Sequence, residues 1–439
     1  MNRFAVDTAI TFLSRIIQLI MGIGISVIIA RVLGPQGNGI YTLAILFPTL
    51  IVNFANFGIG EASVFFLGKQ KYSEREIYGN NIFFSIIFSA AGLILAFLII
   101  VLFKQTLFSE VSSIYLYLGL LLIPAMFFMR FGTYFLLGLQ KIKQYNLISI
   151  LRAFIFLILL LVLLLTLRFD VKAAIATNIV SWLLAAILLL YLIRQIIGSF
   201  QVFHIKSYFK NALQYGFKVY LGSTVGWLHY HVDIFLINIL SNPLAVGFYS
   251  VAVIIIEKLW MISQAAGVVL FPHVSSEANE DKLRKFTPLV CRNILVITCI
   301  AAIILFFLSR VLIVTFYSMK FVNSIVPFQI LLIGAVTMSG WRILAVDIYG
   351  RGRPELNIYI SSMCLLLNVL LNLFLIPKYG IVGAAWATSC SYTLAFVLIT
   401  IVYHKLFDVE ITDMILIKIS DLKFYGNFVT MLRDRYLAP

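Results

Sequence analysis

The sequence has little charge: only 12% of its 439 residues are Asp, Glu, Lys or Arg, whereas 62% are hydrophobic. One water-soluble core cannot bury that much apolar surface, so the composition excludes an ordinary globular protein. A helix of about 20 apolar residues crosses the hydrocarbon of a bilayer, and in lipid the backbone groups must pair within the segment. We therefore expect an all-α integral membrane protein with about twelve transmembrane helices.

Other absences narrow the function. The chain has no GxxxxGK[ST] motif, which argues against ATP-driven work. Its four cysteines form no close pair, so we interpret them as apolar packing residues. His229 and His231 lie two residues apart, which places them on different faces of a helix and does not suit a shared metal ion. We expect no metal site, no cofactor and, because no connection exceeds 17 residues, no extramembrane catalytic domain. An enzyme is not expected.

Hydropathy predicts the individual spans at 4–30, 40–67, 81–103, 111–137, 147–167, 171–193, 211–240, 243–271, 287–308, 322–349, 355–376 and 380–404. We divide the chain into an N-lobe with helices 1–6 (1–193), a cytoplasmic inter-lobe linker (194–210), a C-lobe with helices 7–12 (211–404) and a cytoplasmic tail (405–439).

Lys and Arg in the connections give the orientation. The side shared by both termini carries 19 of them and the other side seven, so both termini are expected in the cytoplasm. The net charge of +15 then mostly reflects topology. Nucleic acid is not an expected partner, because these charges are spread over short loops.

The two halves contain similar sequences. Gly39-Ile40-Tyr41 falls on Gly247-Phe248-Tyr249 at an offset of 208, and the run 173–177 (AAIAT) falls on 384–388 (AAWAT) at an offset of 211. Six helices per copy is an even number, so the copies share an orientation and are related by an axis along the membrane normal. The sequence thus predicts two six-helix lobes.

Seven cations lie within the predicted spans, where a charge near the bilayer centre costs about 2.5–3.5 kcal/mol on insertion scales. We favour a functional role for Arg15, Lys218 and Lys258, on predicted helices 1, 7 and 8. Arg130 and Arg342 fit a cavity role and a structural role equally well. The other two, Arg152 and Arg292, are predicted about one turn inside the cytoplasmic face, where snorkelling to the headgroups is expected.

Small polar residues recur on the same helix faces as some of these cations, and four acidic residues also lie within the predicted spans. Thr11, Arg15, Gln18, Gly22 and Ser26 recur at three- and four-residue steps on one helix face, and the seventh span repeats such a stripe. The stripes predict a hydrated, cationic cleft between the lobes, although helix packing through small polar residues explains their Gly and Ser members equally well. The intramembrane acids serve either as ion-pair partners of the cations or, with His229, in coupling to H⁺ or Na⁺: Glu61, Asp233, Glu257 and Asp347.

Four segments carry a family resemblance: ARVLGPQGNGIYTLA (30–44), NFANFGIGEASVFFLGK (53–69), GLQKIKQYN (138–146) and GIVGAAWATSCSYTLAF (380–396). With them, residues 1–404 resemble the Wzx-type polysaccharide flippases of the MOP (multidrug, oligosaccharidyl-lipid, polysaccharide) exporter superfamily. The resemblance implies two lobes around a cationic cavity that opens alternately to either face of the inner membrane. It also implies that Arg15 matches a basic residue of the first helix that helps to hold a diphosphate.

The cargo implied by that resemblance is an undecaprenyl-diphosphate-linked oligosaccharide destined for O-antigen, capsule or exopolysaccharide. Membrane lipids and the polysaccharide polymerase machinery are the implied partners. Two alternatives stay open: a cation-coupled small-molecule (multidrug) exporter of the same superfamily and, less favoured, a membrane polysaccharide polymerase. The chain departs from the lipid II flippases in its tail 405–439, which is too polar for two further spans and is expected to be an amphipathic cytoplasmic segment.

Overall fold

The computed structural model describes residues 3–166, 170–277, 279–418 and 421. These residues are helical almost throughout and contain no strand, as expected from the composition. The elements in chain order are α1 (Arg3–Ala55), α2 (Ile59–Gly68), α3 (Glu74–Leu107), α4 (Ser113–Leu120), α5 (Leu122–Gly138), α6 (Ile142–Thr166), α7 (Val171–Ile197), α8 (Ile205–Leu240), α9 (Pro243–Leu259), α10 (Met261–Ser276), α11 (Glu280–Leu312), η1 (Ile313–Tyr317), η2 (Met319–Ser324), α12 (Ile325–Gly350), α13 (Pro354–Phe407) and α14 (Ile411–Ile415).

Two helices are long enough to cross the membrane twice. α1 has 53 residues and α13 has 54, so each would measure about 80 Å at 1.5 Å per residue, far more than one bilayer. Each is broken at a glycine with positive φ, Gly34 at 66° and Gly380 at 57°, a conformation that residues with a Cβ rarely adopt. Each therefore contributes two crossings.

α8 also crosses from one side to the other. Just before its start, the Phe203 carbonyl accepts a hydrogen bond from Asn80 Nδ2 near the beginning of α3, and near its end Asn238 Nδ2 donates to the Leu107 carbonyl at the end of α3. Nine segments of the described chain are long and apolar enough to span a membrane, α8 not among them. Counting the two broken helices twice and adding α8 gives twelve crossings, which confirms the expected number.

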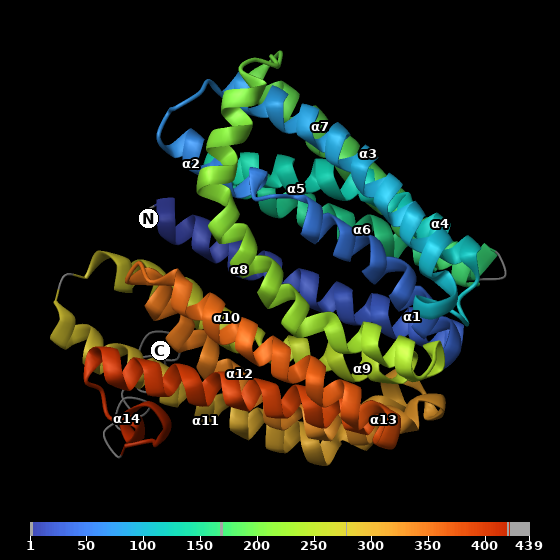
Figure 1. The fold of residues 1–439 in the computed structure, drawn as a ribbon, viewed down its shortest axis with the longest axis vertical. Coiled ribbons are helices and arrows are strands. Elements are labelled where there is room, and N and C mark those ends of the chain that lie inside the picture. Colours follow the sequence, from blue (N-terminus) through green and yellow to red (C-terminus); the bar gives the residue numbers. More distant parts are fainter. Residues whose placement is uncertain (1–2, 167–169, 278, 419–420, 422–439) are drawn as a thin grey trace, which may run out of the picture.

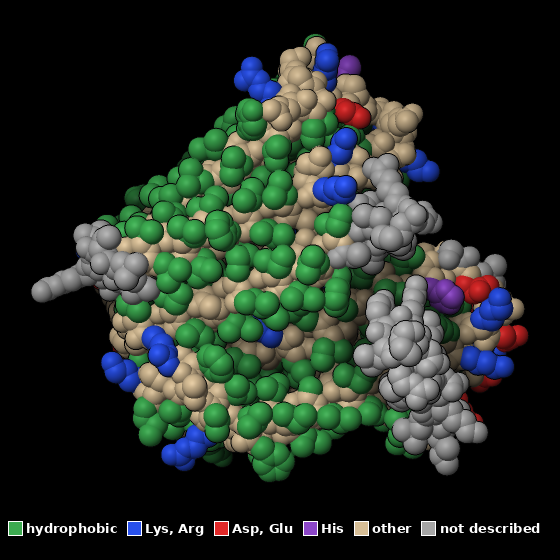
Figure 2. Space-filling view, turned by 180° about the vertical axis from the view of Figure 1, so that it is seen from behind, with side chains coloured by type: hydrophobic (Ala, Val, Ile, Leu, Met, Phe, Trp, Pro, Cys, Tyr) green, Lys and Arg blue, Asp and Glu red, His purple; other side chains and the backbone are tan. Residues whose placement is uncertain are grey.

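The surface matches a bilayer. Figure 2 shows a broad field of hydrophobic side chains across the middle of one face, with Lys and Arg gathered toward its two ends. Large apolar side chains are exposed on several helices, for example Leu102 at 68%, Phe307 at 77% and Phe374 at 69%. Such extensive apolar exposure is stable in lipid and not in water, so the chain is a multi-span membrane protein.

The helices form two bundles, α1–α7 and α8–α14, that diverge toward the end carrying both termini and converge at α1 and α9 (Figure 1). The backbones touch where they converge. A Cβ added to Gly39 would lie 1.7 Å from the Pro243 carbonyl oxygen, and one added to Gly247 would lie 1.8 Å from that of Pro35. Since Pro243 and Gly247 follow Pro35 and Gly39 by 208 residues, equivalent segments of the two repeats meet here. We call this contact the crossing.

Several predicted boundaries were too tight. The connection between α7 and α8 is not 194–210, because α7 continues to Ile197 and α8 begins at Ile205. Likewise α3, α6 and α11 begin five to seven residues before the predicted starts at 81, 147 and 287. Hydropathy locates only the hydrocarbon-embedded part of a helix, and these helices extend beyond it with polar first turns. Of the tail, α14 and its flanks up to Lys418, and Asp421, are described; residues 419–420 and 422–439 lie outside the described residues.

Candidate functional site

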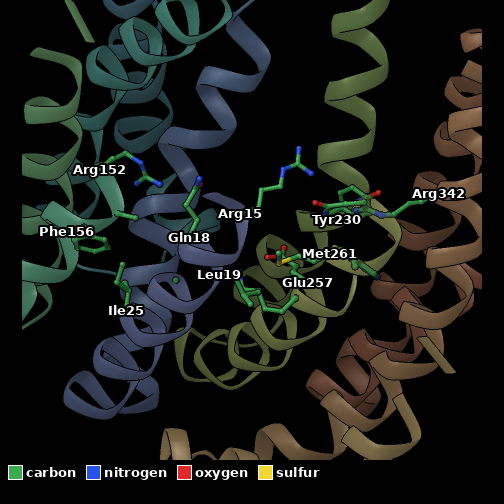
Figure 3. Close-up of a pocket in the computed structure, with 15 residues that line it drawn as sticks. Arg15, Gln18, Leu19, Ile25, Arg152, Phe156, Tyr230, Glu257, Met261 and Arg342 are labelled. Atoms are coloured by element: carbon green, nitrogen blue, oxygen red, sulfur yellow. The ribbon is translucent and has the colours of Figure 1, made fainter. Parts of the chain in front are cut away.

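A cavity of about 640 Å³ lies between the two bundles. Figure 3 shows α1 on one side of it, with α8 and α12 on the other. Its walls combine charged, amide and aromatic side chains from α1, α6, the α9–α10 junction, α8 and α12: Arg15, Gln18, Leu19, Gly22, Ile25, Arg152, Ala153, Phe156, Tyr230, Glu257, Lys258, Trp260, Met261, Gln264 and Arg342.

The cavity is strongly cationic. Four of its lining residues are basic and Glu257 is its one acid, which gives a net charge of +3. No carboxylate within the described part of the chain forms an ion pair with Arg15, Arg152, Lys258 or Arg342. Unpaired cations facing a polar space inside a membrane protein attract an anion, because the alternative is an uncompensated charge.

Arg342 is held by aromatic rings instead of by an acid. Its guanidinium carbon lies 4.8 Å from the ring centroid of Trp260 and 5.2 Å from that of Tyr230. Arg342 Nε and Trp260 Nε1 are both buried without a hydrogen-bond partner among the described residues. Stacking fixes the guanidinium plane and leaves its N–H groups to donate to a ligand.

Arg15 belongs to the predicted stripe on α1. Arg15, Gln18 and Gly22 line the cavity together, one turn apart on the same face. Further along, Ser26 Oγ lies 2.9 Å from Tyr317 Oη, and Arg31 donates hydrogen bonds to the carbonyls of Thr315 and Phe316. These contacts and the crossing close the cavity at the end away from the termini.

Arg152 is a correction to the sequence interpretation. It was expected about one turn inside its span and to snorkel to the headgroups, but the structure turns its side chain to a partner within the protein. Its guanidinium stacks on Trp182, 4.6 Å from the ring centroid, and the side chain lines the cavity. Arg152 and Phe156 are four residues apart and so lie on the same face of α6, the face that lines the cavity. This spacing was the signal in the sequence that could have identified that face.

Arg130 does not line this cavity. Its NH2 group forms an ion pair with Glu61 Oε1 at 3.1 Å, and its NH1 group donates to Asn53 Oδ1 at 3.0 Å. The side chain of Glu61 is 8% exposed and that of Arg130 is 21% exposed. Arg130 was expected in either a cavity or a structural role, and Glu61 as either an ion-pair partner or a coupling acid; the structure joins the two to each other inside the first bundle.

Asp233 is the centre of a buried network between α8, α9 and α13. Its Oδ2 accepts hydrogen bonds from the Tyr249 hydroxyl at 2.6 Å and from Thr388 Oγ1 at 3.1 Å. Asn368 Nδ2 donates to Thr388 Oγ1, Asn372 Nδ2 donates to Asn368 Oδ1, and Asn372 Oδ1 is buried without a partner among the described residues. Sequence reasoning found Asp233 but missed the asparagines, which look like ordinary polar packing residues.

The remaining predicted residues lie in several different places. His229 is buried, and its Nε2 forms a hydrogen bond with Ser391 Oγ. Glu257 faces the cavity, and His231 Nε2 lies 3.9 Å from its Oε1. Asp347 is fully buried, where it pairs with Arg351 and accepts from Thr287. The side chain of Lys218, in α8, lies outside the described residues.

Arg292 is a second correction. Its Nε and NH2 groups bind the two carboxylate oxygens of Asp421 at 2.5 and 2.7 Å, and NH1 donates to the Asp413 carbonyl. A neutralised guanidinium has no need to reach the headgroups, so the snorkelling expected for Arg292 was wrong.

Comparison with known proteins identifies the family to which the chain belongs. Residues 4–278, more than half of the chain, match the family described as "Polysaccharide biosynthesis protein". The chain belongs to this family.

Similar proteins agree with the fold. The "Putative O-antigen transporter" of Shigella flexneri is 25% identical over 412 residues, which cover 86% of this chain and 92% of that protein. The solved structure of the lipid II flippase MurJ in an inward closed conformation superposes with a TM-score of 0.75 at 18% identity, covering 99% and 92% of the two chains. An inward-facing MATE multidrug transporter of the MOP superfamily has a TM-score of 0.71 at 14% identity, covering 89% and 94%. The chain therefore shares the fold of these two transporters, as the resemblance implied.

Proposed function

We propose that the protein is a flippase that moves a polyprenyl-diphosphate-linked oligosaccharide, of the undecaprenyl type, across the inner membrane by alternating access. The observation that carries the proposal is the cavity between the bundles, whose described lining has one acid and four cations without an ion-pair partner among the described residues. The family and the O-antigen transporter similarity point to the same class of cargo.

The physical task explains the cavity's composition. A diphosphate and its sugars cannot enter hydrocarbon, so a protein must replace their hydration while the polyprenyl chain stays in lipid. Arg15, Arg152 and Arg342 can each donate two parallel hydrogen bonds to phosphate oxygens, and Lys258 supplies a point charge. Gln18 and Gln264 add amide groups suited to sugar hydroxyls.

Alternating access requires each end to close in turn. The contacts of Ser26 and Arg31 with η1 close the end away from the termini, while the bundles diverge at the other end. With the termini in the cytoplasm, as the loop charges predict, this arrangement receives cargo from the cytoplasmic leaflet. Breaking the Arg31 contacts and rocking the bundles about the crossing would open the outer side.

We further propose ion coupling at the Asp233 network. A carboxylate, the Thr388 hydroxyl, the Asn368 carbonyl and the unpartnered Asn372 carbonyl form the oxygen-rich set that a hard cation such as Na⁺ prefers. Protonation of Asp233 is the competing use of the same carboxylate. Either event changes the charge of a buried site that joins α8, α9 and α13, and so biases the two conformations.

The test is transport in proteoliposomes. A fluorescent undecaprenyl-diphosphate oligosaccharide placed in one leaflet should reach the other faster with the protein than without it, and Arg15→Gln should slow this transfer about tenfold or more. Separate proton and sodium gradients identify the coupling ion. If organic cations are moved instead and the lipid is not, the multidrug exporter is the correct function; the net positive cavity argues against it, because like charges repel a cationic drug.

A further inference from the structure

A second histidine, His231, lies beside Glu257, the one acid among the described residues that line the cavity. His231 is in α8 and Glu257 in α9, with His231 Nε2 3.9 Å from Glu257 Oε1. Both side chains are partly exposed, at 22% and 31%, and Glu257 lines the cavity. The pair therefore lies where a proton can enter from water and where its charge acts on a bound ligand.

The other ring nitrogen determines where the proton can be. His231 Nδ1 lies 3.1 Å from the backbone carbonyl of Trp227, which can only accept, so Nδ1 carries a hydrogen. In the neutral ring Nε2 is then a bare acceptor that faces a carboxylate oxygen. Two acceptors repel each other, so the pair becomes attractive only with one proton between them, on Nε2 or on Glu257.

Stacking favours the proton on the ring. The imidazole lies flat on the Trp227 indole, with centroids 4.6 Å apart and planes inclined by 11°. An indole face attracts an imidazolium more strongly than a neutral imidazole. The contacts on Nδ1 and on the ring face thus suit a histidine that gains and loses a proton at Nε2.

The charges around the pair oppose that proton when the cavity is empty. Five titratable groups line the cavity together with Glu257, namely Lys258 on α9, Tyr230 on α8, Arg15 on α1, Arg152 on α6 and Arg342 on α12. Asp233 on α8 acts on His231, and Tyr392 on α13 acts on Glu257. Among these the cations outnumber the acids four to one. An anion that binds the cations screens them from His231, and the proton then costs less.

We propose that His231 and Glu257 form a proton-binding site that fills when an anion occupies the cavity. The identity of that anion as a lipid diphosphate rests on the proposed function; the proton site itself does not. By linkage, the proton strengthens diphosphate binding by the same factor as the diphosphate strengthens proton binding. The protein groups of the cavity therefore carry their largest positive charge when an anion is bound there.

The first experiment detects the proton directly. Full-length protein with ring-¹⁵N histidine in nanodiscs is compared with His231→Gln to assign the His231 signals. We expect a neutral ring to be protonated at Nδ1, and we expect Glu257→Gln to lower the imidazolium fraction several-fold relative to wild type at the same pH. A ring protonated at Nε2, or one indifferent to Glu257→Gln, would overturn the proton site.

A matched control exists on the surface. Exposed His204 pairs with Glu76 at 3.0 Å, outside the cavity. Glu76→Gln should change the His204 signals and leave those of His231 unaltered.

The second experiment measures the coupling with farnesyl diphosphate as the probe. Between pH 8 and pH 6 the affinity of the wild-type protein should rise about three- to tenfold more than that of His231→Gln, whose pH dependence reports the ionisation of the diphosphate itself, and Glu76→Gln should behave as wild type. Equal pH dependence in wild type and His231→Gln would refute the coupling. Failure to bind at either pH would refute the proposed cargo and the coupling together, while the ring signals still decide whether the pair holds a proton.

Discussion

Arg130 and Arg342 occupy similar places in the two repeats and have opposite surroundings. They are 212 residues apart, close to the repeat offset, on α5 and α12. Arg130 is neutralised by Glu61, whereas Arg342 has only the faces of Tyr230 and Trp260 and opens on the cavity. The comparison teaches that a cation within a membrane span is not a site by itself. Its partners decide whether it holds the bundle together or binds a ligand.

The largest expected effect comes from breaking the ion pair between Arg130 and Glu61. Glu61→Leu leaves Arg130 as an uncompensated buried charge, which should cost about 3–5 kcal/mol of stability. Thermal unfolding of the purified protein measures it.

The double variant is the control. Glu61→Leu with Arg130→Met removes both charges, so it should unfold close to wild type and keep its transport. A double variant as unstable as the single one, or inactive while stable, would show that the pair does more than neutralise itself.

On the unpaired side, replacing Arg15 and Arg342 together by Gln should slow translocation about a hundredfold, since each charge-assisted contact to phosphate is worth about 1.5–3 kcal/mol. Stability should change little, because neither residue has an ion-pair partner among the described residues to leave stranded. Arg310→Gln, exposed at the end of α11, serves as the control with one charge removed outside the cavity. Normal translocation by the stable double variant would contradict the cationic site.

At the crossing the two repeats are alike, and equal effects are expected there. Gly39→Ala and Gly247→Ala each place a methyl group against a backbone carbonyl, so each should cost about 1–3 kcal/mol and slow transport. Gly24→Ala, where a Cβ meets nothing within 4 Å, should be neutral. Unequal effects of the first two variants, in thermal unfolding and in transport rate, would show that the repeats do not share this contact evenly.

Periodicity and hydropathy predicted the helices and their number, because lipid imposes the same requirement on every span. They also marked Arg15 and Lys258 as functional cations and Glu257 as a pairing or coupling acid, since charge inside hydrocarbon needs a reason, and the structure brings all three to one cavity. They could not predict which charges pair, because Glu61 and Arg130 are 69 residues apart and Arg292 and Asp421 are 129 apart. Nor could they assign His231, whose importance depends on Trp227 and Glu257 meeting at one place.

Substitutions of Arg152 have the smallest expected effect. They test whether this residue acts in the cavity or only reaches the headgroups. Its guanidinium is partly satisfied by Trp182, so Arg152→Gln should slow translocation only about three- to fivefold. Arg152→Lys keeps the charge but loses the flat stacking face, and should lie between wild type and Gln in the same assay. A residue that merely snorkelled to the headgroups would tolerate both changes without loss. Graded rates across the three proteins would therefore place Arg152 with the other cations that line the cavity.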